Sequence, residues 1–122
     1  MQILKRDQAP PFVGADEGIV REIVAPKNSL FDRGSLAEIT VEPGKTIVPH
    51  RHRTTHELYY ILRGEGLMQV GDERAAVGPG DAIPVPERAR HQIRNRGRED
   101  LVFLCVCIPA WQAEDVELLG ES

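Results

Sequence analysis

Short runs of branched apolar residues alternate along the chain with breaks rich in glycine and proline. Such runs are typical of strands, and the breaks between them are typical of turns. No convincing helical pattern lies between the runs. We predict strands at Leu36–Val41, Ile47–Arg53, Leu58–Arg63, Leu67–Val70, Ala82–Val85 and Leu101–Ile108. Many short strands at this spacing predict an all-β sandwich or barrel.

Two of the breaks predict specific turns. Pro43-Gly44 suits the central pair of a type II turn, because proline fixes the first φ angle and glycine tolerates the positive φ of the second position. Gly71-Asp72 lies between Met68–Val70 and Glu73–Ala75 and predicts a tight hairpin.

The two ends of the chain differ from its middle. Pro10 and Pro11 predict that residues 1 to about 25 form an extended arm rather than a helix. Trp111–Leu119 could form one or two helical turns. We expect one domain over residues 1–122, with the arm and first strands at 1–34, the barrel core at 35–108 and a tail at 109–122.

Composition narrows the class of protein. A length of 122 residues fits one domain, and 5% aromatic residues imply a core of Val, Ile and Leu. The net charge of −4 argues against general nucleic-acid binding. The first residues lack the apolar run of a signal peptide, and no segment approaches a membrane span. Cys105 and Cys107 lie too close on one strand for a good disulfide, so we expect a cytoplasmic protein.

Arginine is concentrated in one short stretch. Five arginines lie within eleven residues, namely Arg88, Arg90, Arg94, Arg96 and Arg98. A solvated strand edge and turn explains such a run. The alternative is a local positive field that attracts an anionic small molecule.

Histidines carry the clearest chemical signal. His50 and His52 lie two residues apart in a predicted strand, so both side chains point to the same side. Two imidazoles buried together are best stabilised by a shared metal ion, although solvated histidines on a polar strand face are the alternative. His91, far away in sequence, could supply a ligand from another strand. Strand parity leaves open whether His56 or Glu57 completes the set, because Arg53–Thr55 is expected to be a turn or bulge.

Residues 44–64 resemble the first cupin motif, and residues 80–95 resemble the second. The first motif is matched by Gly44, His50, His52, Glu57 and Gly64. The second is matched by Gly80, Pro86, His91 and Asn95, while Arg88 stands where the family usually has glycine. The resemblance implies a cupin double-stranded β-helix, a jelly-roll barrel, here with an extended N-terminal arm.

The resemblance also implies a ligand set. By similarity, His50, His52, Glu57 and His91 hold one divalent metal ion, and this assigns the fourth ligand to Glu57 rather than His56. Three nitrogens and one carboxylate leave open positions that suit Fe, Mn, Ni or Zn and a bidentate oxygen ligand. Asn95 is expected to be structural.

We therefore expect a metal-dependent enzyme of the dioxygenase or isomerase/lyase (including decarboxylase) type, acting on a small, oxygenated, anionic organic molecule. The alternative is a non-catalytic cupin that binds or senses a sugar or an organic acid. Tyr59 and Arg88 are candidate catalytic residues, although we expect Tyr59 first of all to be a core residue. We expect Cys105 and Cys107 to pack as small apolar side chains, with a sulfur near the metal as the alternative. We expect a homodimer, with the N-terminal arm packing across the partner.

Overall fold

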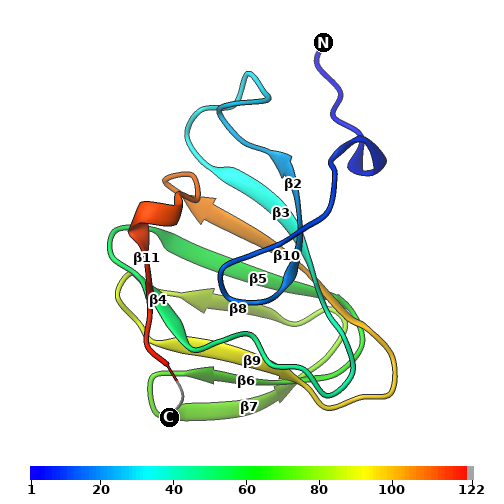
Figure 1. Cartoon of the computed structure of the whole chain (residues 1–122), viewed down its shortest axis with the longest axis vertical. Coiled ribbons are helices and arrows are strands. Elements are labelled where there is room, and N and C mark those ends of the chain that lie inside the picture. The colour runs from blue at the N-terminus through cyan, green and yellow to red at the C-terminus, as the bar shows by residue number, and fades with distance from the viewer. Residues whose placement is uncertain (121–122) are drawn as a thin grey trace.

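A computed structural model describes residues 1–120 of the chain (Figure 1). The strands are β1 (Phe12–Val13), β2 (Ile19–Val24), β3 (Ser35–Val41), β4 (His50–His52), β5 (His56–Arg63), β6 (Gly66–Val70), β7 (Glu73–Val77), β8 (Ala82–Val85), β9 (His91–Asn95), β10 (Leu101–Ile108) and β11 (Val116–Leu118). Two short 3-10 helices, η1 (Arg6–Gln8) and η2 (Ala113–Asp115), lie outside them. Across residues 1–120, no helix has both the length and the apolar character that a membrane span requires.

The strands form two antiparallel sheets. Six strands pair in the order β1-β2-β3-β10-β5-β8, and five pair in the order β11-β4-β9-β6-β7. Strands far apart in sequence are neighbours: β10 lies between β3 and β5, and β9 lies between β4 and β6. Figure 1 shows the two sheets curving around one interior. This arrangement confirms the predicted all-β jelly-roll barrel.

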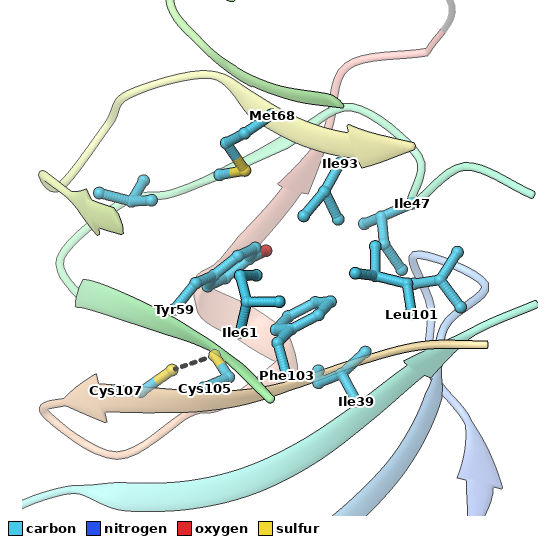
Figure 2. Packing of buried hydrophobic residues seen from close by; sticks show 12 residues of the cluster. Ile39, Ile47, Tyr59, Ile61, Met68, Ile93, Leu101, Phe103, Cys105 and Cys107 are labelled. Atoms are coloured by element: carbon cyan, nitrogen blue, oxygen red, sulfur yellow. Dashed lines mark hydrogen bonds between the residues drawn. The ribbon is translucent and has the colours of Figure 1, made fainter. Parts of the chain in front are cut away.

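The core lies between the sheets and follows the period of two in each strand. Tyr59 and Ile61 of β5 are buried while the residues between and beside them are exposed. Leu101 and Phe103 of β10 face the same interior, and Ile93 of β9 meets them from the other sheet (Figure 2). Tyr59 stacks on Phe103 with ring centroids 4.4 Å apart. Burial of each large side chain contributes about 1.5–3 kcal/mol, so this cluster stabilises the packing of the two sheets.

Both predicted turns are confirmed. The Lys45 amide donates to the Glu42 carbonyl over 3.0 Å, and Gly44 has φ +79°, the angle that a type II turn requires at this position. Gly71-Asp72 joins β6 to β7, with Val70 and Glu73 as the last paired residues.

The N-terminal arm is shorter than expected. Residues 19–24, which we assigned to the arm, form β2 and pair with β3. The two prolines restrict only their own neighbourhood, whereas the open edge of β3 offers backbone groups that β2 satisfies.

The C-terminal tail also differs from the prediction. A single 3-10 turn at Ala113–Asp115 replaces the one or two helical turns expected there. The next residues form β11, which pairs with β4 and covers its edge (Figure 1). The strand β9 was likewise not predicted, because only its turn and His91 were apparent in the sequence.

Candidate metal centre

Four side chains from three strands converge inside the barrel. His50 and His52 come from β4, Glu57 from β5 and His91 from β9. One ligand atom from each of them lies within 4.8 Å of the others, and all four residues are buried. His50 and His91 are direct cross-strand partners in the β4–β9 pair, which explains how a residue 41 positions away reaches the same point.

The fourth position is occupied by Glu57 and not by His56. The turn Arg53–Thr55 shifts the strand phase, so that Glu57 shares the inward parity of Tyr59 while His56 is exposed. Asp115 fixes this turn: its carboxylate accepts the amide hydrogens of Thr54 and Thr55 over 3.0 and 3.1 Å. The tail therefore sets the phase that the sequence alone left open.

Backbone carbonyls orient two of the imidazoles. Nδ1 of His50 contacts the Val48 carbonyl at 2.8 Å, and Nδ1 of His91 contacts the Ala89 carbonyl at 3.0 Å. A carbonyl oxygen only accepts, so each Nδ1 carries the hydrogen and each Nε2 presents a lone pair. Such fixing of the tautomer is a regular feature of metal-binding histidines.

Three of the four ligand atoms have no hydrogen-bond partner within the described chain. Glu57 Oε1 lies 2.7 Å from Nε2 of His91 and 3.2 Å from Nε2 of His52. These contacts lack hydrogen-bond geometry, so the three atoms are buried without a hydrogen bond. Four donors on one ion at bond lengths of about 2.1 Å lie roughly 3 Å apart when adjacent, so this set fits a divalent metal ion.

The pKa values of the group reflect its burial and its internal charges. Burial alone would raise the pKa of Glu57, but His52 and His91 hold that pKa well below its usual value. Burial opposes the charged form of His52, yet the Glu57 carboxylate raises the pKa of His52 overall. Burial and the neighbouring His91 lower the pKa of His50. Glu57 is therefore ionised, as a metal ligand must be.

The second oxygen of Glu57 is held by thiols. Cys105 Sγ donates to Glu57 Oε2 over 2.6 Å, and Cys107 Sγ lies 3.6 Å from the same oxygen. The two sulfur atoms are 3.8 Å apart and lie side by side on β10 (Figure 2). The contact with Cys107 and burial raise the pKa of Cys105 well above its usual value, so this thiol stays protonated and can donate. Oε1 is thereby left to face the histidines.

A cavity opens from the candidate metal centre. Its wall includes His50, Glu57, Tyr59 and Trp111, together with Cys105 and Cys107. The Tyr59 ring lies edge-on to His91, with centroids 5.9 Å apart. Burial and the nearby Glu57 raise the pKa of Tyr59 well above its usual value, so its phenol remains a neutral hydrogen-bond donor. A molecule in this cavity would lie beside both the tyrosine and the donor atoms.

Arg88 keeps the backbone shape of the glycine that it replaces. Its φ is +67°, and its amide donates to the His52 carbonyl over 2.7 Å. The side chain is exposed, with Nε 3.5 Å from the Arg53 carbonyl. Arg88 does not belong to the cavity wall, and the same holds for the other arginines of its run within residues 1–120.

Asn95 has the structural role expected for it. Its amide nitrogen donates to the carbonyls of Val41 and Glu99, each over 2.8 Å, and its oxygen accepts the Gly97 amide over 2.8 Å. These bonds connect β9 to β3 and to the turn before β10.

One residue near the centre was not found by sequence reasoning. Asp16 lies on the loop between β1 and β2, lines the cavity and places Oδ2 3.8 Å from Nε2 of His50. It lies far from both motifs in sequence and in a segment that we assigned to an arm. No pattern of residues pointed to it.

The comparison with protein families decides the identity of the barrel. The model described as "Cupin domain" matches residues 37–107, which is more than half of the chain. This chain belongs to the cupin family. The matched range contains all four residues of the candidate metal centre.

The cupin resembles both uncharacterised and named relatives. It is 38% identical over 121 residues to the uncharacterized protein MJ1618 of Methanocaldococcus jannaschii, covering 98% of this chain and 97% of the relative. It is 32% identical over 83 residues to an oxalate-binding protein of Thermotoga maritima, covering 67% and 69%. The structure of the polyketide cyclase RemF from Streptomyces resistomycificus superposes with a TM-score of 0.82 and 25% identity, over 100% of this chain and 87% of that one.

Proposed function

We propose that this cupin holds one divalent metal ion on His50, His52, Glu57 and His91 and acts on a small organic molecule that binds beside it. The observation that carries the proposal is a buried group of four ligand atoms within 4.8 Å of one another, three of which have no hydrogen-bond partner among the described residues. Buried polar groups are normally satisfied, so such a set in a folded barrel calls for a cation. Fe, Mn, Ni and Zn all suit the donors.

The open side of the centre determines the chemistry that we propose. A bound metal of this kind supplies Lewis-acid activation or, if it is iron, dioxygen chemistry. The protein's own contribution is to hold four donors on one side, leaving the cavity side for the oxygens of a ligand. Tyr59, as a neutral donor in the wall, would hydrogen-bond to that ligand. We assign the activity to the dioxygenase or isomerase/lyase class.

Elemental analysis of protein purified anaerobically without added metal tests the proposal. About one iron per chain supports the dioxygenase class, and oxygen uptake with catechols, diketones and keto acids is then measured. Stoichiometric manganese, nickel or zinc supports isomerase or lyase chemistry. A protein that takes up none of these ions, even when they are added after folding, contradicts the proposal.

A second candidate function is binding without turnover. It is favoured by the similarity to a protein named for binding oxalate. The two functions differ in one measurement: a bound ligand recovered unchanged after prolonged incubation with the metal-loaded protein and dioxygen supports binding alone.

We further propose that the protein is a homodimer. Leu58, Tyr60 and Leu62 of β5 and Ile108 of β10 are between 39% and 55% exposed on the outer face of the six-stranded sheet. A contiguous apolar face of this kind is typical of an interface, and a second copy would cover it together with the N-terminal arm. A monomeric mass at micromolar concentration would contradict the proposed homodimer.

We also propose that the chain is one domain over residues 1–122. We assign it to the cytoplasm, in keeping with the two free cysteines among the described residues.

A further inference from the structure

The loop that carries Asp16 is fixed against the barrel. The Gly14 amide donates to the Gly18 carbonyl over 2.8 Å, which closes the loop between β1 and β2. The Val48 amide donates to the Asp16 carbonyl over 2.9 Å, which joins the loop to the segment leading into β4. A Cβ at Gly18 would lie 2.7 Å from Ile47 Cδ1, so the loop packs closely on the core at this glycine.

The Asp16 side chain faces the cavity in a defined orientation. Its Oδ1 accepts the Gly18 amide over 3.2 Å, while Oδ2 lies 3.8 Å from Nε2 of His50. Nε2 is the nitrogen whose lone pair faces the candidate metal centre, because Nδ1 is engaged with a backbone carbonyl. The side chain is 20% exposed and lines the cavity. Oδ2 is thus presented to any ligand bound beside the metal.

The cavity wall carries negative charge, in contrast to the positive field that the arginine run alone would predict. The wall carries the carboxylates of Asp16, Glu22 and Glu57 and, within residues 1–120, no lysine or arginine. Glu57 is directed at the histidines, and Glu22 pairs with Lys27 Nζ at 2.8 Å. Asp16 has no lysine or arginine within salt-bridge distance among the described residues. Apart from the 3.8 Å contact with Nε2 of His50, the charge of Asp16 has no partner among the described residues and would act on a ligand in the cavity.

We propose that Asp16 selects the ligand of this cupin. Its carboxylate accepts a hydrogen bond from a hydroxyl group of an uncharged molecule that has two neighbouring oxygens, and it repels a dicarboxylate such as oxalate. This inference rests on the proposed function, because the ligand occupies the same metal centre. It assigns the substrate class as hydroxylated and uncharged, in contrast to the name of the oxalate-binding relative.

Isothermal titration calorimetry of Mn(II)-loaded protein with catechol and with oxalate, under anaerobic conditions, tests the inference. The wild type is expected to bind catechol more tightly than oxalate. Asp16→Asn keeps the size of the side chain and removes its charge. This change is expected to weaken catechol binding about tenfold and to strengthen oxalate binding about tenfold, in line with a charge-assisted hydrogen bond.

Glu22→Gln is the matched control, since it removes another carboxylate from the same wall. Because Glu22 already pairs with Lys27, we expect both affinities to change less than about threefold. Equal effects of the two substitutions on oxalate would show a general charge effect and overturn the role of Asp16. The Mn(II) affinity of Asp16→Asn is measured first: its loss would make Asp16 a metal ligand and also overturn the inference.

Different results contradict the proposed function and the role of Asp16. A wild type that takes up none of Fe, Mn, Ni and Zn contradicts the proposed function and this inference with it. If another of these ions binds in place of Mn(II), the titrations use that ion. If the metal-loaded wild type and Asp16→Asn bind oxalate equally tightly, this inference alone is contradicted.

Discussion

Replacing His91 with alanine tests the ligand assignment most directly. His91 is fully buried, and its Nε2 lies 2.7 Å from Glu57 Oε1 in the group of donor atoms. A four-ligand divalent site is worth about 10–16 kcal/mol, which is about 2.5–4 kcal/mol per ligand. Loss of one ligand is therefore expected to weaken metal binding by roughly 10²- to 10³-fold.

Thermal unfolding converts this affinity into a measurable shift. Metal at about 1,000 times Kd stabilises the wild type by about 4.1 kcal/mol, and a 100-fold weaker site leaves about 1.4 kcal/mol at the same concentration. With an unfolding entropy of about 0.26 kcal/mol/K for 122 residues, these values correspond to about 16 °C and about 5 °C in Tm. Calorimetry of metal-free protein, with Mn(II) or Zn(II) added, gives both shifts.

His56→Ala is the matched control, because His56 is exposed at the start of β5 and next to Glu57 in sequence. It should retain the full metal-induced shift. Because the comparison is between each variant with and without metal, a lower stability of metal-free His91→Ala does not affect it. A full shift in His91→Ala, or a lost shift in His56→Ala, would refute the assignment.

Three further predictions concern the surroundings of the centre. Cys105→Val removes the thiol that donates to Glu57 Oε2 over 2.6 Å and is expected to weaken metal binding about tenfold. Cys107→Val should weaken metal binding less, because Cys107 Sγ lies 3.6 Å from the same oxygen. Equal losses of metal affinity in a titration would contradict this prediction. Arg88→Gly relieves the backbone strain of a residue at φ +67°, so it should stabilise the fold by about 1 kcal/mol and raise Tm by about 4 °C. Gly44→Ala introduces a side chain at φ +79° and should lower Tm. A lower Tm for Arg88→Gly would contradict the strain argument. Burial lowers the pKa of His52, but the Glu57 carboxylate raises it overall, so a metal ion must displace a proton from His52 and metal affinity should fall as the pH decreases through that raised pKa. Calorimetry in buffers of different ionisation enthalpy should detect the proton release. A metal affinity that is unchanged between pH 8 and pH 6 would contradict this prediction.

Local residue patterns predict most, but not all, of the strands and turns of this chain. Five of the six strand runs, the type II turn at Pro43-Gly44 and the hairpin at Gly71-Asp72 follow from local chemistry, and the structure contains them. Of the sixth run, Ile47–Arg53, only His50–His52 is a strand. The strands β9 and β11 were missed, and β1 and β2 were expected only as first strands without bounds within residues 1–34. β9 and β11 have weak local patterns and pair with strands that offer backbone groups, whereas Ile19, Val20, Ile23 and Val24 of β2 are themselves typical of a strand.

The candidate centre shows the same division. That His50 and His52 share a side follows from the period of a strand, and the two motifs predicted Glu57 and His91 beside them. The choice of Glu57 over His56 could not be derived from the local residues, because Asp115, some 60 positions away, holds the turn that sets the strand phase.

The sequence by itself determined an all-β sandwich or barrel, because turn residues and strand periodicity act over a few neighbouring positions. The resemblance of its two motifs to those of the cupin family implied the cupin barrel and its histidine-rich centre. Only the tertiary structure decided what surrounds that centre. It placed Asp16 in the cavity, Cys105 against Glu57 and Arg88 in solvent. These contacts join segments separated by tens of residues, and they depend on how the sheets close, which no local pattern specifies.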